Sequence, residues 1–304
     1  VARNGAFGGF ASARLRGGSS GQTLVVVDGV VVNDPAAPQG GFNFGNLDVA
    51  DIEQIEVLRG PQSLVWGADA IGGVIYVKTR NRADPLSAFV EGGSLGFARG
   101  GATAFLSDGD AFARATVSGA RSSGVSRAAG GTEDDGWRSL SASLRAFAPL
   151  RADAGATLTF RASDSTTDLD GFPPPLFAFA DTAETEDTRD YTGSLQFDHK
   201  IGHQFSGALT FFGSRIKREN FDAGAPASDA RGNRLGAHYR ALYRLSSEIT
   251  LSAGGEIEET RAVTSGVDER AAAGAVFLLA EASPLSGLTV SAGLRRDEFS
   301  NFAG

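Results

Sequence analysis

Two groups of residues in this sequence could do chemistry, and the first is an acidic stretch. Ser163–Tyr191 carries eight carboxylates against one arginine. Hard oxygen donors from several loop positions are what Ca²⁺ requires. A solvated acidic loop is the alternative, because the stretch lacks the fixed spacing of an EF-hand. The stretch therefore predicts either a calcium site or an acidic surface loop.

The second group is Gly17–Gly21, which reads GGSSG and satisfies the G-x-S-x-G pattern of a nucleophilic serine. That pattern requires a strand before the serine and a helix after it. Here Ser19 follows the residues ARLR and precedes a valine-rich run that is typical of a strand. A soluble β-sandwich hydrolase that uses Ser19 is thus a disfavoured alternative, and we expect the chain not to be an enzyme.

Composition excludes other function classes. The 304 residues include no cysteine and no methionine, and the net charge is −8. Without cysteine there is no disulfide framework and no thiolate metal site. Without a basic block, binding to nucleic acid is not expected. No apolar run approaches the roughly 18 residues of a transmembrane helix. Because the chain has neither an initiating methionine nor a signal peptide, we expect a processed or partial chain.

The elements before Pro85 are short and bounded by turns. Thr23–Asp34 has two valine-rich runs around the Asp28-Gly29 dipeptide, which predicts a type I′ hairpin because both central residues need a positive φ. A short helix capped by Asp48, a strand and a second short helix that stops at Gly72-Gly73 are expected to follow. This pattern predicts a small α/β unit.

After Pro85 the apolar residues recur at every second position. Ala111–Gly119, Ser139–Ala148 and Leu288–Leu294 are examples among about eleven such strands. Short connections alternate with long polar ones at Ser122–Gly136, Ser165–Arg189, Lys217–Asn233 and Ala262–Arg270. This alternation predicts a membrane β-barrel with long extracellular loops, whereas a soluble sandwich would have loops of irregular length. Eleven strands are too few to close the expected cylinder, so we expect further strands outside this chain.

The stretch IEQIEVLRGPQSLVWGADAIGGVIYVKTR, which ends at Arg80, resembles the plug domain of TonB-dependent outer-membrane receptors. The plug motif comprises Asp28, Gly29, Arg59, Gly60, Pro61, Trp66, Gly67, Gly72 and Gly73. The resemblance implies that residues 1–80 are the C-terminal part of a plug, and that residues 86–304 are the N-terminal half of a barrel of about 22 strands. The TonB box and the second half-barrel are expected outside the chain.

The same resemblance implies a function in the bacterial outer membrane. The order of elements and the loop content are most similar to the cobalamin-receptor branch, so we expect TonB-dependent uptake of cobalamin, with a ferric siderophore as the alternative cargo. In that branch, loop aspartates bind calcium, which implicates Asp170, Asp187, Asp222 and Asp229. The residues expected to contact ligand form one plug loop: Asn33, Asp34, Gln39, Phe42, Asn43 and Phe44. A passive porin is disfavoured, because it needs no domain like residues 1–80.

Overall fold

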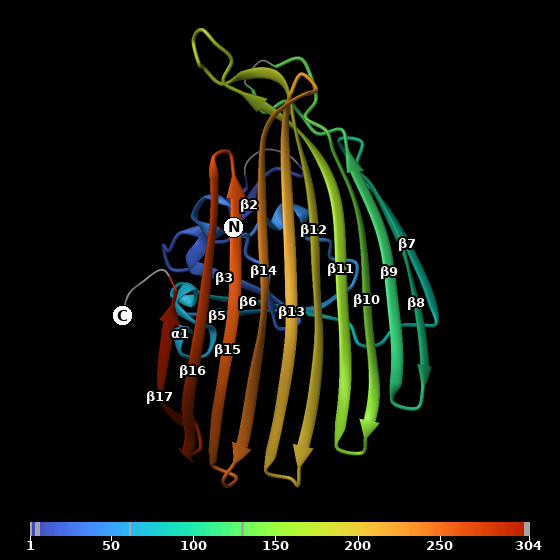
Figure 1. Cartoon of the computed structure of the whole chain (residues 1–304). Helices are drawn as coiled ribbons and strands as arrows, with labels where there is room; N and C mark the ends of the chain where they lie inside the picture. Colours follow the sequence, from blue (N-terminus) through green and yellow to red (C-terminus); the bar gives the residue numbers. More distant parts are fainter. Residues whose placement is uncertain (1, 4–6, 61, 129–130, 301–304) are drawn as a thin grey trace.

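The computed structural model describes residues 2–3, 7–60, 62–128 and 131–300. Within them, no helix has both the length and the apolar character that a membrane span requires. Eleven long strands form one curved antiparallel sheet, which we call the wall (Figure 1). Its strands are β7 (Leu86–Gly92), β8 (Ala98–Asp108), β9 (Ala111–Ser122), β10 (Trp137–Arg151), β11 (Ala154–Gly171), β12 (Ala180–Ile201), β13 (Phe205–Asp222), β14 (Ala225–Arg244), β15 (Ile249–Thr264), β16 (Val267–Leu285) and β17 (Leu288–Phe299). The predicted eleven strands are thus confirmed, and each pairs with its neighbours in sequence order.

The two faces of the wall differ in chemistry, as the period of two predicts. In β9, Arg114, Thr116 and Ser118 are buried on the concave face, whereas Val117 between them is exposed on the convex face. Leucines and isoleucines are likewise exposed on the convex face of other strands: Leu140, Leu158, Leu235, Ile257 and Leu294. An apolar outer face with a polar inner face is the arrangement of a barrel wall in lipid.

Phenylalanines do not all follow the outward pattern. Phe89, Phe147 and Phe197 are candidates for the lipid face by sequence, but only Phe197 is exposed there. Phe147 shares the register of Arg145, which contacts the plug, and Phe89 lies 4.9 Å below the guanidinium of Arg99. The prediction is therefore wrong for Phe89 and Phe147, because alternation fixes which face a residue occupies and its type does not.

The connections at one end of the wall differ from the prediction. Among the described residues, 123–128 and 131–136 belong to a long connection between β9 and β10, and residues 172–179 form a shorter one than expected. The other two predicted loops are wrong: Ala223-Gly224 and Ser265-Gly266 join long strands by tight turns. These strands have polar residues on both faces, so their sequence shows no alternation of apolar and polar residues. The neighbouring strands nevertheless provide hydrogen-bond partners for their backbone groups. The β13–β14 turn thus lies well beyond the plug at this end, whereas the β15–β16 turn lies near the level of the plug (Figure 1).

Residues before β7 form the plug, whose four-stranded sheet has the order β4-β3-β6-β5. The strands are β3 (Thr23–Val27), β4 (Val30–Val31), β5 (Ile52–Arg59) and β6 (Gly73–Thr79), and a separate pair is β1 (Ala2–Arg3) with β2 (Ala11–Ser12). The helices are α1 (Ser63–Trp66) and the 3₁₀ turns η1 (Ser20–Gln22), η2 (Pro38–Gly40), η3 (Phe44–Asn46) and η4 (Ala68–Ala70). The helix expected at Asp48 is absent: its carboxylate accepts a hydrogen bond from the Ala50 N–H at 3.1 Å, which makes a turn.

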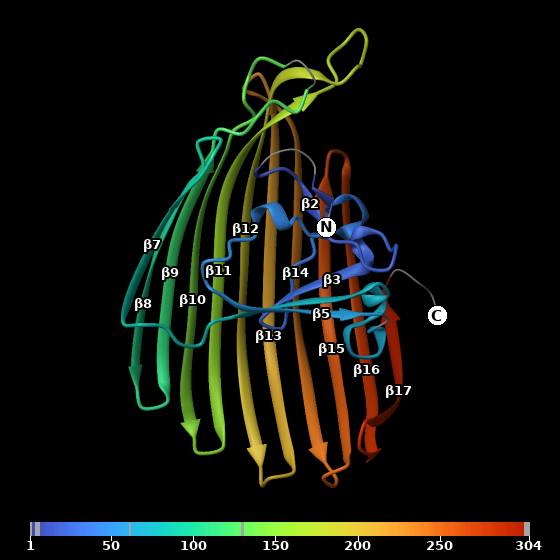
Figure 2. The ribbon, with the colours of Figure 1, turned by 180° about the vertical axis from the view of Figure 1, so that it is seen from behind.

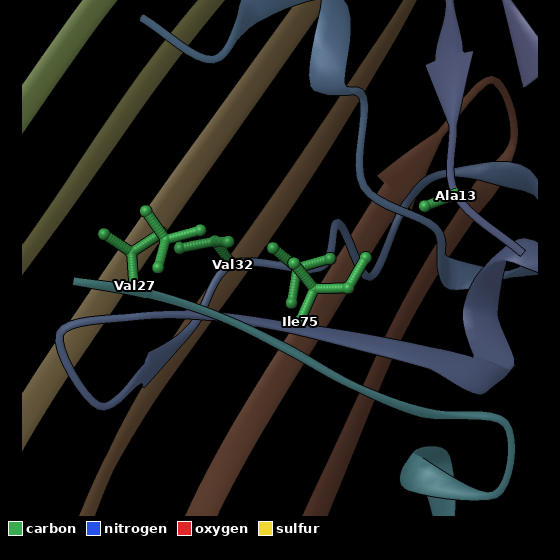
Figure 3. Close-up of a cluster of buried hydrophobic side chains, with 6 residues drawn as sticks. Ala13, Val27, Val32 and Ile75 are labelled. Carbon is green, nitrogen blue, oxygen red and sulfur yellow. The ribbon is translucent and has the colours of Figure 1, made fainter. Parts of the chain in front are cut away.

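Two apolar clusters hold the plug sheet together. One contains Ala13, Val27, Val32 and Ile75 (Figure 3), and the other centres on Val26. Figure 2 shows the plug against the concave face of the wall, with its strands running across those of the wall. The plug therefore has its own core and meets the wall through other residues.

Candidate ligand-binding site

The predicted plug loop begins with two buried polar residues. Both polar atoms of the Asn33 side chain make hydrogen bonds within the plug. Its Oδ1 accepts from the Val25 N–H at 2.7 Å, and its Nδ2 donates to the carbonyls of Thr23 and Gly40. Asp34 accepts from the Ala36 N–H at 2.8 Å. These contacts fold the loop back on β3, so Asn33 shapes the loop.

Asp34 also connects the loop to the wall. Its Oδ2 lies 3.0 Å from a guanidinium nitrogen of Arg218 on β13, and the same nitrogen donates to the Ala36 carbonyl at 3.0 Å. Burial raises the pKa of Asp34, and the charge of Arg218 together with hydrogen bonds from the loop backbone partly offsets that rise. The tip of the loop is therefore pinned to one strand of the wall.

The remaining four loop residues divide by exposure. Gln39 is exposed, with a φ of 65°. Asn43 caps η3, and its Oδ1 accepts from the N–H groups of Ala11 and Gly45 at 2.9 Å each. Phe42 and Phe44 are half-buried, pack edge to face at 4.9 Å and lean on the plug core. Gln39 is thus the one exposed side chain of the six, and contact of these residues with a ligand stays a prediction.

Three further aspartates of the plug pair with wall arginines. Arg99 lies 2.7 Å from Asp48, Arg145 lies 3.3 Å from Asp28, and Arg161 lies 2.5 Å from Asp51. Burial acts to raise the pKa of Asp48, but hydrogen bonds from Ser118, the Ala50 N–H and Arg99 lower it overall. Together with Asp34, these residues form four ion pairs that seat the plug. Arginines on the inner face were expected to pair in this way, and Arg145 and Arg161 do so.

The plug motif residues occupy turns that their types explain. Asp28 and Gly29 have φ values of 48° and 88°, as a type I′ hairpin requires. Arg59 ends β5, Gly60 turns with a φ of 100°, and Pro61 lies outside the described residues.

Close backbone contacts explain the later glycines of the motif. Trp66 ends α1, and Gly67 follows with a φ of 86°. A Cβ on Gly73 would lie 2.3 Å from the Leu58 carbonyl oxygen, and one on Gly72 would lie 2.9 Å from that of Gln22. Only glycine fits at these two positions.

The four aspartates predicted to bind calcium do not come together. Asp187 accepts from the Thr166 hydroxyl at 2.7 Å, Asp222 ends β13, and Asp229 is opposite Glu219 on the neighbouring strand. They are separated because the expected loops are extended strands: Asp187 on β12 and Asp229 on β14 are both opposite Glu219 on β13, which lies between them.

Asp170 alone lies in a carboxylate cluster. One oxygen from each of Glu133, Asp170 and Asp181 lies within 4.8 Å of the others. Asp135 is completely buried nearby, where its own carboxylate interacts with that of Asp170, and its Oδ1 has no hydrogen-bond partner among the residues that the structure describes. A hydrogen bond shared with Asp181 raises the pKa of Glu133 to about 7. Sequence reasoning missed Glu133, Asp135 and Asp181, although Asp181 lies inside the acidic stretch that it singled out.

Ser19 is not placed for nucleophilic catalysis. It caps η1 in a capping box with Gln22, and its N–H donates to the Gln22 side chain at 2.9 Å. The serine therefore has a structural role at the start of a short 3₁₀ turn.

The comparisons with known proteins agree with this architecture. Residues 1–74 match the family model of the TonB-dependent receptor plug domain. Residues 1–74 are therefore a plug domain of the TonB-dependent receptor type, and the chain is similar to a fragment of such a receptor. The vitamin B12 transporter BtuB of Vibrio vulnificus (strain YJ016) is 51% identical over 79 residues, which are 26% of this chain and 13% of that protein. BtuB of Vibrio cholerae (strain O395) is 36% identical over 93 residues, which are 31% and 15% of the two chains.

Solved structures match over almost the whole chain. The siderophore receptor PirA of Acinetobacter baumannii has a TM-score of 0.76 at 16% identity, over 98% of this chain and 52% of its own. The FrpB iron transporter of Neisseria meningitidis has a TM-score of 0.77 at 15% identity, over 98% and 54%. This chain thus spans about half the length of these receptors, and at such identity the likeness shows the shared fold.

Proposed function

We propose that this TonB-dependent receptor takes up a scarce, bulky nutrient across the bacterial outer membrane, with cobalamin favoured over a ferric siderophore. The observation that carries the proposal is the seated plug: four buried or half-buried aspartates bind wall arginines across the lumen. A lumen held shut in this way does not suit a passive porin. It calls for energy from outside the barrel, which the TonB complex would supply.

Cobalamin is favoured by where the sequence similarity lies. The 51% identity to a vitamin B12 transporter falls within a 79-residue segment, whereas the siderophore receptors share the fold at 15–18% identity. The proposed steps break no bond in the cargo. Ligand contacts the plug loop around Gln39 and the strand ends above it, the plug shifts, and force from the inner membrane opens a route.

Uptake measurements test the cargo. A strain that lacks its own cobalamin receptor is complemented with the complete natural gene, and labelled cyanocobalamin is supplied with and without a functional TonB. We expect TonB-dependent accumulation that excess ferric chelates do not reduce. If cobalamin is not accumulated and the ferric chelate is bound instead, the cargo is a siderophore. Accumulation of cobalamin without a functional TonB would reject active transport.

We further propose that Glu133, Asp170 and Asp181 hold a Ca²⁺ ion at the connection between β9 and β10. Three carboxylates with converging oxygens and the unpartnered Oδ1 of Asp135 beside them fit a hard cation. Asp170 also accepts from the N–H groups of Arg127, Ala128 and Thr182, so it already fastens this connection to β12. A bound ion would neutralise the repulsion among the carboxylates.

Calcium titration of the purified receptor tests the site. Because Glu133 holds a proton up to a pH of about 7, calcium must displace it, and the apparent affinity should rise as the pH increases through 7. We expect Asp181→Asn to weaken calcium binding by at least about tenfold and the exposed turn variant Asp110→Asn to leave it unchanged. Equal affinity in all three proteins would reject the site.

A further inference from the structure

Two cavities lie along strand β14, one above the other. The larger, of about 970 Å³, occupies the lumen at the short-turn end and is lined by Phe147, Asp198 and Leu242 among others. The smaller, of about 140 Å³, lies between the α1–η4 segment of the plug and strands β14–β17. Arg240 lines both cavities.

The direction of β14 places Arg240 at the boundary between them. The strand descends towards its short turn, with Arg234 and His238 in the smaller cavity and Leu242 in the larger. These residues share one face because side chains alternate along a strand. The guanidinium of Arg240 therefore separates the space beside the plug from the lumen beneath it.

Arg240 contacts the plug through the aromatic ring of Trp66. Its guanidinium lies 4.1 Å from the ring centre of Trp66, at the end of α1. Among the described residues no carboxylate is within ion-pair distance of Arg240, and its Nε is buried without a hydrogen-bond partner. The other two arginines of the smaller cavity differ, because Arg234 pairs with Glu258, and Arg295 pairs with Glu256.

The predicted ligand loop also contacts β14. A Cβ on Gly232, six residues above His238 on β14, would lie 2.4 Å from Asp34 Oδ1. The loop thus packs on this strand directly above the smaller cavity. From its first residues towards its short turn, β14 lies beside the ligand loop, then the smaller cavity, then the Trp66–Arg240 contact and finally the open lumen.

We infer that the cargo crosses the receptor between the α1–η4 segment and strands β14–β17, and that the contact of Trp66 with Arg240 is the gate of this route. The inference rests on the proposed transport function and locates its path. Displacing α1 breaks this cation–π contact and the 3.5 Å hydrogen bond from Arg295 to the Val65 carbonyl, and it leaves no carboxylate unpaired, so the gate can open reversibly. The lining carries three arginines and four acidic residues, Asp69, Glu256, Glu258 and Asp297, which suits a bulky polar cargo with little net charge.

Ion conductance in planar bilayers tests the gate without any cargo. The receptor from the complete natural gene is compared with Trp66→Ala and Arg240→Ala, which remove the same contact from the plug and from the wall. We expect both to raise the frequency of open events by about tenfold or more. The matched comparison is Arg161→Ala, which removes a plug contact on β11, far from the route. Because the other three ion pairs still seat the plug, we expect it to raise the frequency of open events much less than the two gate variants.

The control decides between a gate and a loosened plug. Equal conductance in Arg161→Ala and Arg240→Ala would overturn the inference, as would closed channels in both gate variants. Because no ligand is present, these results do not depend on whether cobalamin is the cargo. Failure of cobalamin uptake by the unaltered receptor would reject the proposed function alone.

Engineered disulfides give a second test, since the chain contains no cysteine. A Cβ on Gly293 of β17 would lie 2.3 Å from the Leu64 side chain, so Leu64→Cys with Gly293→Cys ties α1 to the wall of the route. Gly8→Cys with Trp137→Cys ties the plug to β10 on the far side. We expect oxidation of the first pair to abolish the open events of Arg240→Ala, with recovery on reduction, and the second pair to have no such effect. Block by the second pair alone would place the path elsewhere.

Discussion

At the scale of single residues, the plug loop separates side chains that shape the site from one that can contact cargo. Asn33 makes three hydrogen bonds inside the plug, whereas Gln39 is exposed. We predict that Asn33→Ala lowers plug stability by about 2–3 kcal/mol, because it leaves buried backbone groups unpaired. Gln39→Ala should leave stability unchanged and weaken ligand binding. Urea unfolding followed by Trp66 fluorescence, with Trp137 replaced by phenylalanine, measures the first effect, and equilibrium binding the second.

The opposite pattern would contradict this division: a stable Asn33→Ala variant with weakened binding would make Asn33 a ligand contact. Sequence could identify the Asp28-Gly29 turn because its geometry depends on two adjacent residues. It could not identify the partner of Asp34, because Arg218 is 184 positions away and lies in a stretch expected to be a loop. Residue roles that depend on such distant contacts require the fold.

At the scale of elements, the contact between the turn after η3 and strands β8 and β9 should respond to acid. The pKa of Asp48 is lowered in the folded protein, so its stabilising effect is present above a pH of about 4 and is lost as the pH falls through the folded pKa. We predict that Asp48→Asn costs about 2 kcal/mol at neutral pH and that the two stability curves converge on acidification. Urea unfolding between pH 2 and 7 measures this, with the exposed Asp69→Asn as control. Parallel curves would contradict the prediction.

Strands were predictable where one face meets an apolar environment and the other does not. Ala111–Gly119 lies within β9, where Val117 faces outward between inward polar residues. Residues 217–222 and 225–233 were not predicted to be strands, because both of their faces are polar and their sequence shows no alternation. Their strand form comes from pairing with neighbours, which a single-sequence pattern does not contain.

At the scale of the whole molecule, the pattern of residues predicted a wall and a small α/β unit, but their nesting came from family resemblance. Nothing in the period of β5 or β6 says that this sheet lies across the wall strands. The structure supplies the physical reason: aspartates on the plug meet arginines at inward positions of β8, β10, β11 and β13. The charges that seat the plug are therefore distributed around the wall and away from the plug's own core.

The orientation of the wall gives the last prediction. Leu158 and Thr157 are neighbours on β11, and they face the convex and concave sides respectively. Leu158→Arg should cost about 2–4 kcal/mol of stability in lipid, because it puts a charge on the lipid face. Thr157→Arg should cost less than about 1 kcal/mol, because its side chain enters the polar lumen. Reversible unfolding of the receptor in lipid vesicles measures both. Equal costs for the two arginines would mean that the convex face does not meet lipid, and the uptake route along β14 would lose the membrane that it is proposed to cross.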